Sequence, residues 1–192
     1  MVLKNVKGFN PQTVMGIDCS TNGAGICVLD KGVPVKWGKI NFKGPDIYAR
    51  IKDAGARIDA VKDDFQVDFI LLESAVVGPN AATGLKLSLM YGAVLSHLLI
   101  QDTKIDMCAP NVWMNYIGNK TMTKAQTEQL TKANPGKSKS WVTEEKRRVR
   151  KTFTLNWVKD KYGIELEDDD VGDSFGLAYY AYSNMDKYKN AR

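Results

Sequence analysis

Residues 14–30, VMGIDCSTNGAGICVLD, decide the fold of this chain. Two short apolar runs flank an Asn22-Gly23 pair, a pattern that is typical of a tight β-hairpin. The first run ends in a carboxylate, Asp18, although the residues before it have the composition of a buried strand. A buried carboxylate costs several kcal/mol unless it is paired or coordinates a metal. The remaining sequence must therefore supply a partner for Asp18.

Length and composition predict one intracellular domain. The chain has 192 residues, of which 44% are hydrophobic and 26% are charged, as in an ordinary globular protein. We expect no secretory signal, because the start MVLKNVKGFNPQT lacks an apolar core, and no membrane span, because no run of about 18 apolar residues is present. Cys19, Cys27 and Cys108 lack metal-ligand spacing and lie in predicted strands. We interpret them as free buried thiols in a reducing, cytoplasmic location.

The positive charge of the chain is concentrated in one segment. Residues 120–151 contain ten basic and three acidic residues, a balance of +7, whereas the whole chain carries +5. This asymmetry indicates a face that binds a polyanion. A solvated loop followed by the charged face of a helix is the alternative interpretation.

The periodicity of the apolar residues predicts an α/β fold with a mixed sheet. After the hairpin, strands are expected at 33–42, 67–72 and 104–109. Helices are expected at 46–65, 81–100, 110–117, 142–162 and 170–185. We therefore predict a five-stranded mixed sheet, a three-strand meander plus parallel strands, flanked by helices in the ribonuclease H-like order. A polar, basic insertion at 119–142 contains at most one weak helix, near residues 123–130.

Three further acidic residues are candidates for the partnership that Asp18 needs. Glu73 ends the apolar strand at 67–72, and Asp170 and Asp173 lie three residues apart, on one face of the last helix. The neighbouring Asp168 and Asp169 need no such explanation, because acidic residues at a helix N-terminus complement its dipole.

A group of carboxylates without a nucleophile predicts metal chemistry. Mg²⁺ takes oxygen ligands from a few carboxylates and leaves positions for phosphate and water. Two such ions about 4 Å apart activate water and stabilise the leaving oxygen of a phosphodiester. The only histidine, His97, lies in an apolar helix, and we interpret it as structural.

The helix at 81–100 is apolar on nearly every side, so more than one of its faces should be covered. One face would pack on the sheet. The other would pack on further helices or on a second copy of the chain, and we favour the second copy.

Three motifs together resemble one family. GIDCSTNGAG, ILLES and DDDVGDSFGLAYYAY are similar to the acidic motifs of the RuvC-like Holliday junction resolvases. The resemblance spans residues 15–182 and includes helix 81–100, which is similar to the family's dimer-forming helix. It implies that Asp18, Glu73, Asp170 and Asp173 are the catalytic residues and bind two Mg²⁺ ions, with Mn²⁺ as a substitute. It also implies a single RuvC-like nuclease domain over residues 1–192.

The resemblance further implies an activity and partners. We expect a crossover junction endodeoxyribonuclease, a homodimer through helix 81–100 that cuts branched DNA with symmetric nicks. Our candidates for contacts with DNA phosphates are six basic residues of the charged segment: Lys120, Lys124, Lys146, Arg147, Arg150 and Lys151. The chain departs from the family pattern between Pro110 and Gly118, where the family has a lysine and this sequence has none.

Three other functions compete with a junction resolvase. A nuclease of the same type could act on flaps, forks or other branched DNA. The hairpin also resembles the phosphate loop of actin- and hexokinase-like ATPases, but those proteins need two such domains. A DNA-binding protein that has lost cleavage is the third, and the four intact acids argue against it, because unpaired carboxylates in one pocket repel each other.

Overall fold

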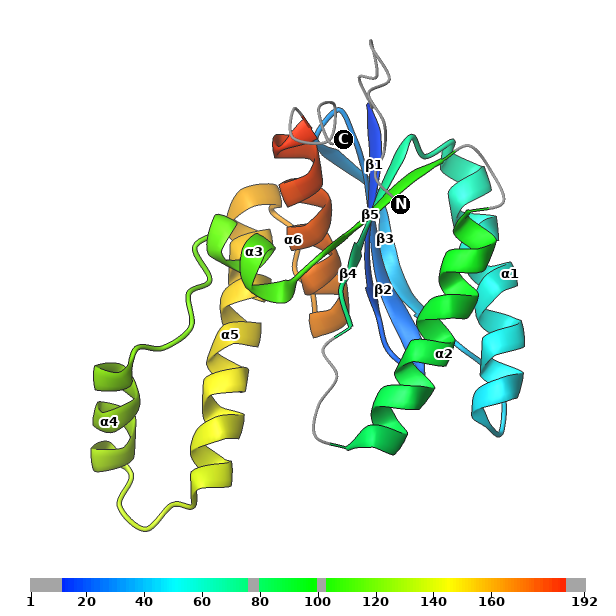
Figure 1. The fold of residues 1–192 in the computed structure, drawn as a ribbon. Coiled ribbons are helices and arrows are strands. Elements are labelled where there is room, and N and C mark those ends of the chain that lie inside the picture. The colour runs from blue at the N-terminus through cyan, green and yellow to red at the C-terminus, as the bar shows by residue number, and fades with distance from the viewer. Residues whose placement is uncertain (1–11, 76–79, 100–102, 186–192) are drawn as a thin grey trace.

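The computed structural model describes residues 12–75, 80–99 and 103–185 (Figure 1). Its centre is a five-stranded sheet with the strand order β3-β2-β1-β4-β5. The strands are β1 (Thr13–Cys19), β2 (Gly23–Asp30), β3 (Val33–Asn41), β4 (Phe69–Glu73) and β5 (Lys104–Cys108). The first three form an antiparallel meander, and β4 and β5 run parallel to β1. The predicted mixed sheet is confirmed.

Helices cover both faces of this sheet, which gives three layers (Figure 1). One face carries α1 (Ile47–Phe65) and α2 (Ala81–Leu98), and the other carries α3 (Pro110–Tyr116), α5 (Lys139–Tyr162) and α6 (Asp169–Ser183). A further helix, α4 (Lys124–Ala133), stands away from the sheet and runs beside the outer half of α5. No helix within the described residues has the length and hydropathy needed to cross a membrane.

Alternation along β1 assigns its side chains to two cores. Met15 and Ile17 are fully buried against α1 and α2, whereas Val14 is buried with residues of α3 and α6. Because successive side chains point to opposite faces of a strand, Asp18 shares the α6 face with Val14 and Gly16. This parity decides which layer of helices can reach the carboxylate.

Helix α6 lies close to the sheet because two strand residues on that face are glycines. A Cβ atom at Gly16 would overlap the backbone of Ser174 and Ala178, and one at Gly25 would overlap the carbonyl group of Asp170. The first turn of α6 therefore rests directly on β2, beside the end of β1. This contact brings the acidic start of α6 to the strand residue Asp18.

Helix α2 is covered on two sides and open on a third. It packs on the sheet and along α1, through residues such as Met90 and Val94. Its outer face exposes Leu85 and Leu89, which are 64% and 42% accessible. Of the two partners expected for this helix, a further helix is present, because α1 packs along it. A second copy of the chain on the exposed face remains a prediction. Ile100, the predicted end of this helix, lies outside the described residues.

The basic insertion is more ordered than the sequence indicated. Its helix α4 extends to Ala133 and begins with a capping box between Thr123 and Gln126. Helix α5 begins at Lys139, three residues before the predicted start, because the Ser138 side chain caps it. Four residues of the predicted insertion therefore belong to the first turn of α5.

The cysteines and the histidine behave as expected. Cys19, Cys27 and Cys108 are free and buried. The His97 ring lies 2.7 Å from the Asp59 carboxylate, measured between Nδ1 and Oδ2, so α2 and α1 are joined by this pair. His97 is thus held by a structural contact between two helices.

Candidate metal centre

The sheet register brings the first two predicted acids together. Ile17 of β1 pairs with Leu72 of β4, and both strands run in the same direction. The next residue of each strand is acidic, Asp18 in β1 and Glu73 in β4, and both point to the α6 face. Two carboxylates 55 positions apart in the sequence therefore end adjacent strands at the same edge of the sheet.

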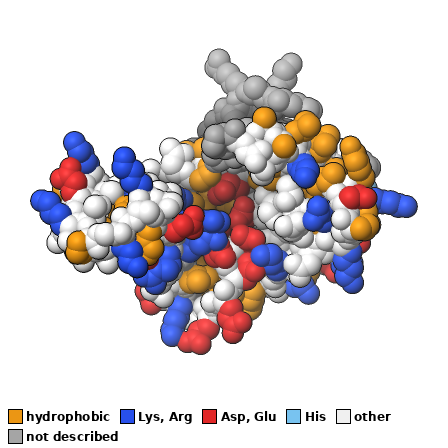
Figure 2. Space-filling view, turned by 90° about the horizontal axis from the view of Figure 1, so that it is seen from below, with side chains coloured by type: hydrophobic (Ala, Val, Ile, Leu, Met, Phe, Trp, Pro, Cys, Tyr) orange, Lys and Arg blue, Asp and Glu red, His pale blue; other side chains and the backbone are white. Residues whose placement is uncertain are grey.

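Helix α6 adds the other two acids to the same place. Asp170 and Asp173 lie in its first turns, which Gly25 allows to rest on β2. All four predicted acids line one cleft of about 640 Å³. Figure 2 shows acidic side chains gathered in the hollow of this face, with basic side chains beside them.

Burial and mutual repulsion make these carboxylates hard to ionise. Burial, together with the charges of Asp173 and Asp170, raises the pKa of Asp18 well above its usual range. Burial and the charge of Asp18 raise the pKa of Glu73 in the same way. Burial and the charge of Glu73 raise the pKa of Asp173 to about 7. The folded metal-free protein therefore disfavours the ionised form of all three carboxylates.

Lysine and arginine side chains offset part of this charge. Lys151 of α5 lowers the pKa of both Asp18 and Asp173, and Arg150 lowers that of Glu73. Lys39 of β3 donates to Asp170, with 2.8 Å between Nζ and Oδ2. These cations come from two elements, so the charge balance of the cleft depends on tertiary packing.

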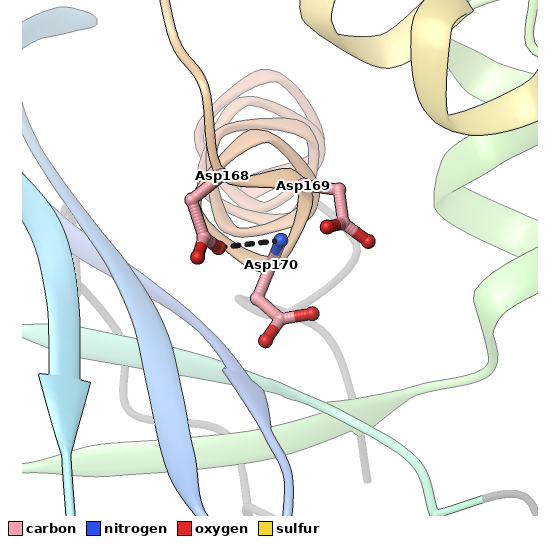
Figure 3. Close-up of side chains that lie close together, drawn as sticks. All are labelled: Asp168, Asp169 and Asp170. Atoms are coloured by element: carbon pink, nitrogen blue, oxygen red, sulfur yellow. Dashed lines mark hydrogen bonds between the residues drawn. The ribbon is translucent and has the colours of Figure 1, made fainter. Parts of the chain in front are cut away.

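A second acidic group lies at the very start of α6. Single oxygen atoms of Asp168, Asp169 and Asp170 lie within 4.8 Å of one another, and Figure 3 shows Asp168 and Asp169 pointing to opposite sides of the helix end. Lys39 bonds Asp168 as well as Asp170, and Lys151 pairs with Asp169. Asp168 also caps the helix by accepting from two backbone N–H groups. Lysines and helix capping thus account for this group.

The structure divides the six basic candidates into two sets. Lys146, Arg147, Arg150 and Lys151 of α5 line the cleft together with the four acids. Lys120 and Lys124 do not line it; both are exposed, on the connection into α4 and at its first residue.

Sequence reasoning missed several residues that contact the acids. Trp113 of α3 donates its indole N–H to Glu73 Oε2 at 2.7 Å, and Thr154 of α5 bonds Asp173. Lys39 was missed because its signal appears only in the sheet register, where Asp18 pairs with Gly25 and Gly25 with Lys39. None of these residues has a spacing in the sequence that marks it.

The donor set fits a hard divalent cation. The cleft presents carboxylate oxygens from three separate elements and no histidine or cysteine ligand among the residues that line it. Oxygen ligands of this kind suit Mg²⁺ and Mn²⁺. A bound dication would also relieve the repulsion that raises the pKa of Asp173.

Three solved structures share this fold. Thermus thermophilus RuvC in complex with a Holliday junction substrate is 14% identical, with a TM-score of 0.66 over 90% of this chain and 96% of that chain. A second T. thermophilus RuvC structure is 15% identical, with a TM-score of 0.63 over 91% and 96%. The yeast mitochondrial Holliday junction resolvase Ydc2 is 14% identical, with a TM-score of 0.54 over 95% and 86%. At these identities the likeness establishes the fold, including the ribonuclease H-like order of its elements.

Among curated proteins, no sequence matches this chain. The family model described as crossover junction endodeoxyribonuclease RuvC matches residues 14–134, which is more than half of the chain. The matched segment contains nearly the whole sheet, with Asp18 near the end of β1 and Glu73 at the end of β4. The convergence of these acids and the family match lead to one conclusion: the chain belongs to the RuvC family of crossover junction endodeoxyribonucleases.

Proposed function

We propose that this protein is a magnesium-dependent, structure-selective DNA endonuclease that resolves Holliday junctions as a homodimer. One observation carries the proposal: Asp18, Glu73, Asp170 and Asp173, from three elements, line one cleft beside the basic face of α5. The family to which the chain belongs supports a junction as the substrate, and a RuvC of that family has been solved with a Holliday junction substrate.

The four carboxylates would hold two Mg²⁺ ions, with Mn²⁺ as a substitute. Ions bound there would supply an activated water for attack on the phosphodiester and would stabilise the leaving oxygen. Asp18 and Glu73 act from the ends of neighbouring strands, and Asp170 and Asp173 act from α6, the helix that packs on β1 and β2. The basic residues of α5 hold the DNA backbone over this group of acids.

Removal of one carboxylate should abolish cleavage and spare binding. We expect Asp18→Asn and Asp173→Asn to reduce cleavage of a synthetic four-way junction by at least about a thousandfold, because each change removes a metal ligand. Junction affinity, measured by gel shift without divalent ions, should stay within a few-fold of wild type. Wild-type cleavage in either variant would contradict the metal site.

The same cleavage assay, with other substrates, distinguishes the proposed function from the competing ones. Flap, fork and linear duplex DNA serve as comparison substrates with Mg²⁺ or Mn²⁺. Preferred cleavage of flaps or forks would replace the junction as substrate but keep the nuclease. ATP hydrolysis without cleavage of any DNA would favour an ATPase of the actin and hexokinase type.

The raised pKa of Asp173 predicts a stability that falls as pH rises. Above about pH 4 the unfolded chain loses this proton, whereas the folded metal-free protein retains it until about pH 7. Folding is therefore penalised progressively across this range. We expect Asp173→Asn to stabilise the metal-free protein at pH 8 by up to about 4 kcal/mol, and by much less at pH 5, in urea unfolding with EDTA.

Asp53→Asn is a control for which we expect the opposite change in stability. A hydrogen bond from Arg57 lowers the pKa of Asp53, so removal of this carboxylate should destabilise the protein at pH 8. Added Mg²⁺ should stabilise the wild type and leave Asp173→Asn nearly unchanged. If Asp173→Asn changed the free energy of unfolding equally at pH 5 and pH 8, the pKa of Asp173 would not be raised in the folded protein.

The cleft lysines and arginines should contact DNA phosphates. We expect Lys146→Gln and Arg150→Gln to weaken junction binding and to reduce the slope of log affinity against log salt by about 0.9 for each phosphate that the variant no longer neutralises. Lys120→Gln and Lys124→Gln should have smaller effects, because these residues lie outside the cleft. Lys36→Gln, an exposed lysine of β3, is the control. A slope that is unchanged in Arg150→Gln would remove Arg150 from the interface.

The exposed face of α2 supports a homodimer. Leu85 and Leu89 lie one turn apart on that face, and the neighbouring edge strand β5 exposes Met107 by 41%. A second copy would cover these side chains and give the two cuts their symmetry. We expect Leu89→Glu to convert the dimer into monomers in sedimentation experiments, whereas Val33→Glu on the opposite edge strand should not. A wild-type protein that is monomeric at micromolar concentration would contradict this interface.

A further inference from the structure

One short segment is linked to two of the four carboxylates, to Glu73 directly and to Asp173 through a residue of α5. It consists of α3 and the turn that follows it, residues 110–119. Trp113 in this segment is 0% exposed, and its Nε1–H donates to Glu73 Oε2 at 2.7 Å. The indole has a single polar hydrogen, and this bond uses it. The bond therefore determines where one oxygen of Glu73 points.

A second connection runs from the same segment to Asp173. Asn119, which is 4% exposed, donates from Nδ2 to the hydroxyl oxygen of Thr154 at 2.9 Å. Thr154 is 1% exposed and hydrogen-bonds the Asp173 carboxylate. The buried Asn119 and Thr154 thus link the turn after α3, through α5, to the partly buried Asp173 of α6.

The number of hydrogens on Asn119 and Thr154 limits which of these groups donate and which accept. A threonine in a helix commonly donates its hydroxyl hydrogen to the carbonyl four residues earlier, here that of Arg150. Asn119 Nδ2 reaches this carbonyl at 2.9 Å, whereas the Thr154 hydroxyl lies 3.4 Å from it. Asn119 thus uses one amide hydrogen on the Arg150 carbonyl and the other on Thr154. The Thr154 hydroxyl still donates to this carbonyl across 3.4 Å, and its hydrogen bond to Asp173 lowers the pKa of that carboxylate, which is the effect of a donor.

We propose that Trp113 and the Asn119–Thr154 pair are positioning residues that orient Glu73 and Asp173 for metal binding, an inference that rests on the proposed function. Both donors are neutral, so they fix the direction of a carboxylate without cancelling the charge that attracts the metal. Lys39 differs from them, because it brings a positive charge to Asp170. Partners of this kind in other metal sites change metal affinity by roughly 10–100-fold.

Packing alone is the competing explanation for these residues. The Trp113 ring fills the space beside Gly176 of α6, where a Cβ atom would overlap it, and so it also supports the core. A packing role predicts reduced stability with unchanged metal affinity. A positioning role predicts weaker metal binding even where the fold is intact.

The affinity of the full-length protein for Mn²⁺, measured by calorimetry and by electron paramagnetic resonance without DNA, separates the two roles. Trp113→Phe keeps an aromatic ring but removes the N–H, and Thr154→Val keeps the shape but removes the hydroxyl. We expect each to weaken Mn²⁺ binding by roughly 10–100-fold. Thr154→Ser, which restores a hydroxyl, should recover most of the affinity that Thr154→Val loses.

Trp157→Phe is the matched control, because Trp157 is a partly buried indole of α5 that packs on Tyr162 and Tyr179. It should lower the unfolding midpoint and leave Mn²⁺ affinity unchanged. Wild-type Mn²⁺ affinity in both Trp113→Phe and Thr154→Val would overturn the inference, and if Trp113→Phe does not fold, the Thr154→Val and Thr154→Ser pair decides. A wild-type protein that binds no Mn²⁺ would instead refute the proposed function.

Discussion

The parallel pairing of β1 with β4 is the constraint on which the candidate site depends. Its register, Ile17 opposite Leu72, sets Asp18 beside Glu73, and the strand parity turns both toward the α6 layer. The acids of α6 can join them only because Gly16 and Gly25 let the helix backbone rest on the sheet. A shift of one residue in this register would turn a strand carboxylate toward the core formed with α1 and α2, where no cation among the cleft residues could reach it.

Four carboxylates in one cleft repel each other when ionised, and nearby basic side chains offset part of this repulsion. Lys151 and Arg150 approach from α5, and Lys39 approaches from the edge strand β3. Burial and the charge of Glu73 still hold the pKa of Asp173 at about 7, although Lys151 lowers it. A divalent ion would favour the ionised form of these buried carboxylates, and the lysines and arginines that face the cleft are also suited to phosphate. The same side chains therefore serve the stability of the fold and the proposed chemistry.

Much of the fold followed from patterns in the sequence, and the reasons are local. The Asn22-Gly23 turn, the apolar strand ending in Glu73 and the helical spacing of the last segment each depend on residues close together in the chain. The start of α5 was predicted three residues late, because the Ser138 cap lies in a polar stretch without periodicity. Trp113, Thr154 and Lys39 escaped prediction because each contacts an acid from another element. Of the six basic candidates, the two nearest α4 could not be separated from the four of α5 by charge alone.

The sequence by itself determined which acids exist, the elements that carry them and the local charge of the segment before α6, because propensity, turn chemistry and periodicity act between near neighbours. The convergence of the acids could be inferred from it only through the order of the elements and a family resemblance. The tertiary structure decided that Asp18 and Glu73 are neighbours, that Lys39 binds Asp170 and that Asn119 reaches Asp173 through Thr154. These contacts join residues that are distant in the chain, and they depend on strand register and on the close approach of a helix to two glycines. Neither the strand register nor this close approach can be predicted from the residue pattern of a single segment.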